Sequence, residues 1–126
     1  MNKEVCIIVL PLPPRQLSPN VPQGSRGGRI QRAVLSRKYK QLAKAATEAQ
    51  RVDGWERAEV RAVFYYKPRR RRDDVNHLAM LKPAYDGIIQ AGLLPDDDAE
   101  HLRTTGAEFK IDKAHPRVEI IFTRVE

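Results

Sequence analysis

Two acidic clusters and a run of cations carry the residue types that phosphodiester chemistry requires. Asp73 and Asp74 form the first cluster, and the triplet at residues 96–98, with Asp97 at its centre, forms the second. The cations that precede the first cluster are Lys67, Arg69, Arg70, Arg71 and Arg72. Arginines bind phosphate oxygens, and carboxylates hold a hard cation such as Mg²⁺ beside that phosphate. If the fold brings both clusters together, their shared site has the groups to cut a phosphodiester; the alternative is a solvated charge run that closes a strand.

Length and charge limit the classes of protein that this chain can belong to. Its 126 residues, of which 41% are hydrophobic, are enough for one folded domain with a single core. The formal charge of +7 predicts a polyanionic partner. No apolar run approaches the roughly 20 residues of a membrane span, so we expect no membrane partner. The single cysteine, Cys6, cannot form an internal disulfide, and we therefore expect a cytoplasmic location.

The elements that must position the acidic clusters follow from hydrophobic periodicity. The apolar run at residues 4–10 predicts a strand buried on both faces, and residues 15–28 read as a loop. Residues 29–50 have helical periodicity, and alternation predicts a strand at residues 55–67. Strands are also expected at residues 102–111 and 118–125, joined as a hairpin by a turn at residues 113–116. With a helix at residues 76–91, the order β-α-β-α-β-β predicts an α+β fold with one small mixed sheet and two helices.

The helix expected at residues 76–91 lies between the two acidic clusters. Lys82 and Asp86 are four residues apart, so both lie on one flank of this helix. Pro83 conflicts with an unbroken helix, and either the helix kinks there or its regular part begins near Pro83. Gly92 stands where a helix end favours a left-handed residue.

Three stretches of the sequence resemble one family of nucleases. They are Arg-Arg-Asp-Asp-Val-Asn at residues 71–76, Leu-Lys-Pro-Ala-Tyr-Asp-Gly at 81–87, and Ala-Gly-Leu-Leu-Pro-Asp-Asp at 91–97. Together they are similar to the RusA-type Holliday-junction resolvases, crossover-junction endodeoxyribonucleases that are common in phages and prophages. The resemblance is specific at residues 69–97 and looser over the rest of the chain, and it implies a single RusA-like domain at residues 1–126.

Carried over by position, the resemblance assigns roles to individual residues. Asp73 and Asp97 match two metal-binding aspartates, and Lys82 matches a lysine that assists catalysis. The remaining aspartate of the family falls on Val75, which cannot bind a metal. Asp74, one position earlier, is the expected substitute; the alternative is a weakened or inactive site.

The resemblance also implies an activity, a cofactor and partners. Family members are homodimers that use Mg²⁺, with Mn²⁺ as a possible substitute, and nick opposing strands of a four-way DNA junction in recombination and repair. We therefore expect branched double-stranded DNA as the partner and no nucleotide cofactor. The cationic run should contact the DNA backbone without reading bases. The second hypothesis, motivated by Val75, is a protein of the same fold that binds branched DNA and no longer cuts it.

Overall fold

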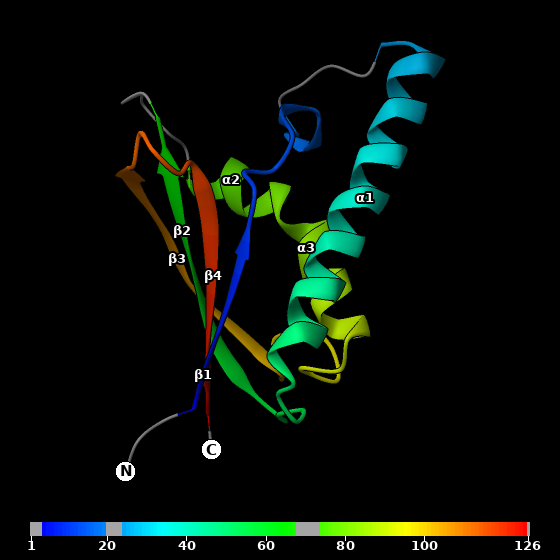
Figure 1. Ribbon diagram of the computed structural model, residues 1–126. Coiled ribbons are helices and arrows are strands. Elements are labelled where there is room, and N and C mark those ends of the chain that lie inside the picture. Colours follow the sequence, from blue (N-terminus) through cyan, green and yellow to red (C-terminus); the bar gives the residue numbers. More distant parts are fainter. Residues whose placement is uncertain (1–3, 20–23, 68–73, 126) are drawn as a thin grey trace.

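The computed structural model describes residues 4–19, 24–67 and 74–125, with the side chains of residues 74–76 left out (Figure 1). Its elements in chain order are β1 (Val5–Leu10), the 3₁₀ turn η1 (Arg15–Leu17), α1 (Arg26–Gln50), β2 (Ala58–Tyr66), α2 (Asp74–Met80), α3 (Lys82–Gln90), β3 (Leu102–Ile111) and β4 (Arg117–Arg124). The expected α+β class with one small mixed sheet is confirmed. None of the helices in these ranges is long and apolar enough to cross a membrane.

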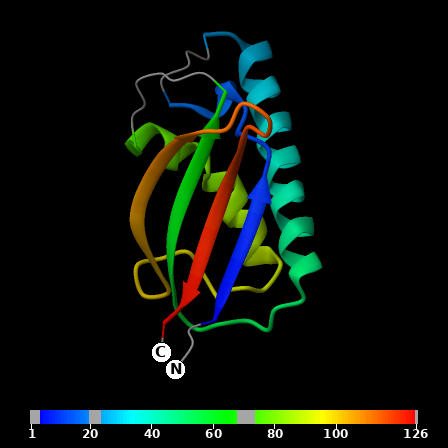
Figure 2. The same cartoon turned by 60° about the vertical axis from the view of Figure 1, so that its left-hand side comes forward.

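The sheet has the strand order β1-β4-β2-β3. β4 pairs with β1 and β2 in antiparallel fashion, and β2 pairs with β3 in parallel. The helices lie on one face of the sheet, and in the described ranges the other face carries no helix (Figures 1 and 2). The core therefore forms a single layer between the sheet and the helices.

The expected hairpin of the last two strands is wrong, because β2 lies between β3 and β4. β3 is reached from β2 through α2 and α3, and such a helical crossover makes the two strands parallel. β4 alternates between buried and half-buried residues, which suits a central strand, whereas the mostly exposed β3 suits an edge. The turn itself is where the sequence placed it: the Asp112 carboxylate accepts hydrogen bonds from the backbone N–H groups of Ala114 and His115, both at 3.1 Å.

The expectation that the first strand is buried on both faces is also wrong. Cys6, Ile8 and Leu10 are buried against the helices, while Val5, Ile7 and Val9 are exposed. The reason is tertiary: β1 is an edge strand of a sheet that the helices cover on one face alone (Figure 2).

α1 begins three residues earlier than periodicity indicated, so residues 26–28 are helical and not part of a loop. Ser25 is its N-cap and accepts a hydrogen bond from the backbone N–H of Gly28 at 3.0 Å. The buried face of α1 consists of Tyr39, Ala43 and Thr47, and the hydroxyl of Tyr39 donates to the carbonyl of Pro11 at 2.8 Å.

The segment expected as one helix is two, with the buried Leu81 between α2 and α3. Pro83 lies in the first turn of α3, where a missing backbone N–H breaks no helical hydrogen bond. Gly92 has the expected left-handed conformation, with φ of 94°. The break at Leu81 makes Lys82 the first residue of α3 and not an interior residue of a longer helix.

Candidate functional site

Lys82 and Asp97 are 15 residues apart in the sequence and in direct contact in the fold. The Lys82 ammonium lies 2.5 Å from Asp97 Oδ2 and 3.1 Å from Asp86 Oδ1, on the next turn of α3. The Lys82 side chain is 59% exposed, whereas that of Asp97 is 20% exposed. A half-buried carboxylate thus faces an exposed cation at the start of α3, open to a ligand from solvent.

The loop between α3 and β3 holds Asp97 in place. Leu93 and Leu94 are buried, and the Leu93 carbonyl accepts a hydrogen bond from the Trp55 backbone N–H at 2.7 Å. One residue before Asp97, Asp96 turns its carboxylate onto the Asp97 backbone N–H at 2.7 Å. Apolar anchoring on one side and a local hydrogen bond on the other fix the direction from which Asp97 meets Lys82.

The contact shifts the pKa values of Lys82 and Asp97 in the directions that favour their charged forms. The hydrogen bond from Lys82 holds the pKa of Asp97 below its usual 3.8, against the opposing effect of partial burial. The same hydrogen bond raises the pKa of Lys82 above 10.5, with Asp86 adding to the effect. Near neutral pH the site therefore presents an ionised carboxylate and an ammonium group.

His101 links this acidic loop to the segment that precedes β2, a contact that was not among the predictions from the sequence. Its Nδ1 lies 2.6 Å from Asp98 Oδ1, and its Nε2 lies 3.6 Å from Glu56 Oε1. The Asp98 carboxylate also accepts the backbone N–H groups of Glu100 and His101. The spacing of Asp98 and His101, three residues apart before a strand, is the sequence signal for this contact.

We expect the pKa of His101 to lie above 6.5, because Asp98 and, less strongly, Glu56 stabilise its charged form. The contribution of this contact to the stability of the fold is then complete below pH 6.5. It is lost as pH rises through the raised pKa of His101. NMR titration of the imidazole protons measures the pKa. Asp98→Asn should bring it back toward 6.5, and Glu56→Gln should lower it less, since its carboxylate is farther away. Equal titration in Asp98→Asn and the parent would contradict the assignment.

The remaining candidate residues are placed in part. Asp73 and the arginines 69–72 lie outside the described residues. Asp74 begins α2, but its side chain and that of Val75 are likewise not described. Lys67 is exposed just beyond the end of β2. Within the described part of the chain, no three histidine, cysteine or carboxylate side chains form a metal-binding group. Of the expected metal ligands, Asp97 alone has a described side chain, and carboxylate is the donor that Mg²⁺ prefers.

His77 is half-buried in an aromatic cluster. Its Nε2 lies 2.7 Å from the Tyr66 hydroxyl. Its ring meets those of Phe64 and Phe109 edge-on, with centroids 5.1 and 4.9 Å apart. These contacts tie the first half of α2, which begins at Asp74, to the ends of β2 and β3.

Comparison with known proteins finds no family model and no curated protein that matches this chain. The described site therefore has to be interpreted from its own chemistry. An ionised carboxylate beside an ammonium group can bind a cation through the first and an anionic oxygen through the second. This pairing suits a negatively charged substrate better than a neutral one.

Proposed function

We propose that this chain is a Mg²⁺-dependent endodeoxyribonuclease that resolves four-way DNA junctions by paired symmetric nicks. The observation that carries the proposal is the contact of Lys82 with Asp97 at 2.5 Å. The resemblance of the sequence to RusA-type resolvases assigns one of these residues to metal binding and the other to catalysis, and a shared site requires them to be neighbours. The proposal includes a RusA-like fold over residues 1–126 as one nuclease domain.

Each group in the proposed site has a separate task. Asp73, Asp74 and Asp97 would hold Mg²⁺, which lowers the pKa of a bound water and neutralises phosphoryl oxygens. Lys82 offsets the negative charge that develops on the phosphate during hydrolysis. Asp86 helps to hold the Lys82 ammonium at the site, at 3.1 Å. Lys67 and the arginines 69–72 bind the DNA backbone, which positions the substrate without reading its sequence.

A homodimer is part of the proposal, because paired nicks on a two-fold substrate require two active sites. The uncovered face of the sheet supports it (Figure 2). Val5, Ile7 and Val9 are exposed there, and Ile121 is the register partner of Ile7. An exposed apolar row of this kind marks an interaction surface, and sedimentation equilibrium measures whether two chains associate.

The test is a cleavage assay on a synthetic four-way junction and on linear duplex of the same sequence, each with Mg²⁺, with Mn²⁺ and with EDTA. We expect paired nicks in the junction with either metal, and no nicks in the linear duplex or in EDTA. Equal cutting of linear duplex would contradict junction selectivity. Cutting in EDTA would contradict the metal requirement.

A second function is favoured by one observation, the valine at position 75 where the resemblance calls for an aspartate. In this alternative the protein binds branched DNA tightly and does not cut it. Tight binding of the junction without nicks in any metal would support the alternative over the nuclease.

Val75→Asp tests whether Asp74 replaces the metal-binding carboxylate that is missing at position 75. If Asp74 is an imperfect substitute for the missing carboxylate, the new aspartate should raise the nicking rate by roughly tenfold or more. The reason is that its carboxylate can bind the metal directly. Val75→Asn, which adds a similar volume without charge, is the matched control and should not raise the rate. An unchanged or lower rate in Val75→Asp would contradict the idea of a displaced ligand.

A further inference from the structure

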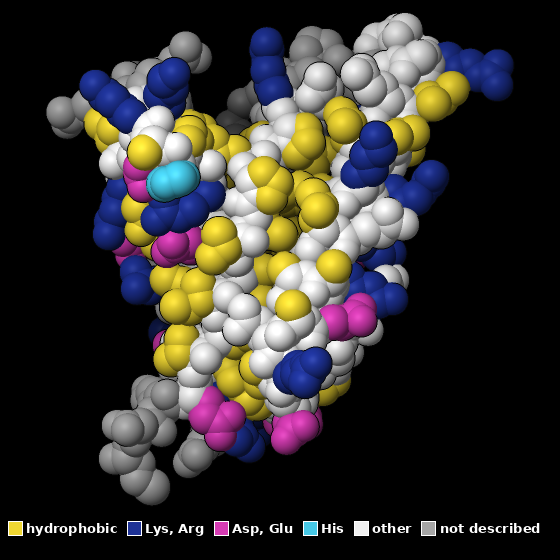
Figure 3. All heavy atoms as spheres, viewed as in Figure 1, with side chains coloured by type: hydrophobic (Ala, Val, Ile, Leu, Met, Phe, Trp, Pro, Cys, Tyr) yellow, Lys and Arg dark blue, Asp and Glu magenta, His cyan; other side chains and the backbone are white. Residues whose placement is uncertain are grey.

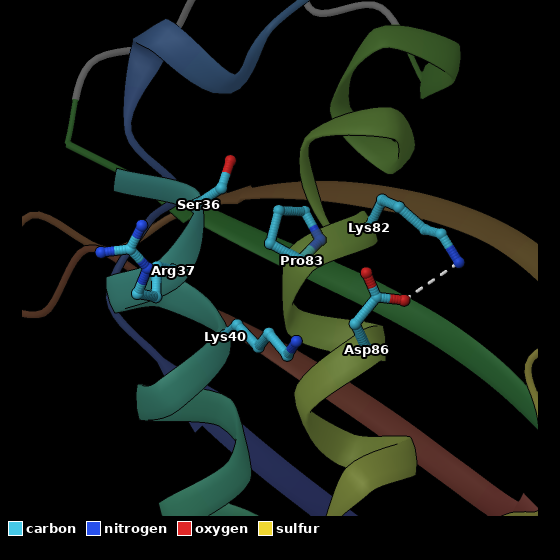
Figure 4. A pocket seen from close by; sticks show the side chains of 6 residues that line it. All are labelled: Ser36, Arg37, Lys40, Lys82, Pro83 and Asp86. Atoms are coloured by element: carbon cyan, nitrogen blue, oxygen red, sulfur yellow. Dashed lines mark ion pairs between the residues drawn. The ribbon is translucent and has the colours of Figure 1, made fainter. Parts of the chain in front are cut away.

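A pocket of about 370 Å³ lies between α1 and α3, next to the Lys82–Asp97 contact. It is lined by Ser36, Arg37, Lys40, Lys82, Pro83 and Asp86. The side chain of Lys40 reaches from α1 toward α3, and Asp86 faces it from the other helix (Figure 4). The volume is within the range of sites that bind small groups.

A close backbone contact at Gly87, next to the pocket residue Asp86, holds α1 and α3 near each other. A Cβ at Gly87 of α3 would lie 2.1 Å from the Lys40 carbonyl oxygen and 3.0 Å from the Lys44 backbone nitrogen. The absence of a side chain at Gly87 therefore lets the backbone of α1 approach α3 closely. This approach places Lys40 opposite Asp86 and Lys82.

The pocket has an excess of positive charge. Among the described residues that line it, Asp86 is the one carboxylate, and the Lys82 ammonium lies 3.1 Å from it. Within the described ranges, neither Arg37 nor Lys40 takes part in an ion pair with a carboxylate. The Ser36 hydroxyl adds a neutral hydrogen-bond donor. Lys40 reaches from α1 toward the hollow, and Arg37 and Ser36 add a second cation and a hydroxyl to its lining. Such groups suit an anion with several oxygens.

The same charge continues along α1. The helix contains seven lysines and arginines and a single acid, Glu48. Lys and Arg side chains gather on the α1 side of the molecule in Figure 3. A row of cations along a helix, leading to a pocket at its middle, matches a polyanion better than a small free ligand.

None of the described residues that line the pocket is aromatic, so these residues offer no surface for stacking a base. Its groups are those that contact phosphates. Lys82 belongs both to this pocket and to the contact with Asp97, so the two sites are adjacent.

We propose that the α1–α3 pocket binds a backbone phosphate of the DNA strand that enters the candidate active site. Lys40 and Arg37 bind its oxygens, and Ser36 donates a hydrogen bond to it. This inference rests on the proposed function for the identity of the polymer. It adds α1 as a second DNA-binding element, separate from the arginine run at residues 69–72.

The first test measures how salt weakens binding of a fluorescent four-way junction, in EDTA so that cleavage plays no part. Loss of one phosphate contact makes the plot of the logarithm of the binding constant against the logarithm of the salt concentration less steep, by about 0.9 in slope. Lys40→Gln should show this decrease and bind the junction about eightfold more weakly at 0.1 M salt. Lys40→Gln with Arg37→Gln should lower the slope by roughly 1.8. Gln is a good helix former, so thermal unfolding should confirm intact variants.

Lys110→Gln is the matched control. Lys110 is exposed on β3 and shares a register position with Tyr65, whereas its neighbour Phe109 stacks on Phe64 on the helix-covered face. Because side chains alternate along a strand, Lys110 points to the uncovered face. The control removes the same charge and should leave the slope unchanged. An equal decrease in both variants would overturn the pocket in favour of a general charge effect.

Inorganic phosphate distinguishes a free anion from DNA as the source of the phosphate group. In NMR spectra, phosphate should shift the amide signals of Ser36 and Lys40 in the parent, and added junction should displace it. Phosphate binding that DNA does not displace would overturn the DNA assignment.

The pocket and the nuclease can fail separately. If Lys40→Gln keeps the parental slope while the parent nicks junctions, the pocket is wrong and the proposed function stands. If the slope falls in a protein that never nicks, the pocket stands and the nuclease is wrong. Absence of any DNA binding overturns both.

Discussion

Asp97→Asn should reduce junction nicking by roughly 10²- to 10³-fold, the equivalent of several kcal/mol of lost metal-assisted stabilisation. An amide keeps the shape of the side chain but loses the negative charge that attracts a cation. Binding of the junction in EDTA should be equal to that of the parent or slightly tighter, because a negative charge near the phosphates has been removed. Nicking is measured on the synthetic junction, and binding by fluorescence anisotropy.

Asp96→Asn is the matched control for this variant. It removes the same charge one residue away, and its amide oxygen still accepts the hydrogen bond from the Asp97 backbone N–H. We expect nearly parental nicking in this control. Equal losses in the two variants would show that the loop needs acidity in general and not a ligand at Asp97.

Asp97→Asn should also have a small, pH-dependent effect on the free energy of unfolding. The Lys82–Asp97 pair is partly exposed, so its loss should lower the free energy of unfolding by about 1 kcal/mol or less. Because the folded protein lowers the pKa of Asp97, this contribution is present above the unfolded value of 3.8. It disappears as pH falls through the lowered pKa. Urea unfolding of parent and variant at several pH values measures the difference, which should shrink in acid.

Gly87→Ala should destabilise the protein by about 1–3 kcal/mol, the usual cost of forcing atoms into a packed interface. The new Cβ would lie 2.1 Å from the carbonyl oxygen of Lys40, and a helix backbone cannot move aside as a flexible side chain can. α1 and α3 must therefore separate, which disturbs the buried contacts of Ala43 and Ile88. The loss should exceed the roughly 1 kcal/mol that alanine gains over glycine in a helix. Urea unfolding measures it.

Gly27→Ala is the control for helix propensity alone. Gly27 lies in the first turn of α1, and the one described side chain within 4 Å of a Cβ there would be that of Ser25, whose hydroxyl lies at 3.9 Å. This variant should be as stable as the parent or slightly more stable. A Gly87→Ala protein with parental stability would contradict the close contact of the two helices.

The sequence by itself determined the kinds and approximate limits of most elements. The periodicity of α1, the alternation of β2 and the turn after β3 are local properties, set by the spacing of apolar residues and by turn-forming side chains. The i,i+4 relation of Lys82 and Asp86 is local as well, and it is confirmed at 3.1 Å. The left-handed Gly92 follows from the freedom of glycine at a helix end.

The tertiary structure decided what depends on neighbours from distant parts of the chain. An apolar run such as Val5–Leu10 is compatible with one or two covered faces, and only one face of β1 is buried because the helices cover one face of the sheet (Figure 2). Two successive strands can pair with each other, but the insertion of β2 between β3 and β4 depends on the helical crossover and on which strand is apolar enough to be central. Pro83 permitted a kink or a new helix, and the burial of Leu81 coincides with the break.

The candidate site divides in the same way. The sequence indicated Lys82 and Asp97 as residues with suitable chemistry, but their contact depends on the loop that Leu93 and Leu94 anchor beside Trp55. The α1–α3 pocket was not apparent, because it joins residues of two helices whose neighbourhood is set by packing. The Asp98–His101 pair is local, and its spacing was a signal that was not used. The residue types determine which chemistry is available, whereas the fold determines which residues are neighbours. Gly87 is an example, because the absence of a side chain there lets α1 approach α3.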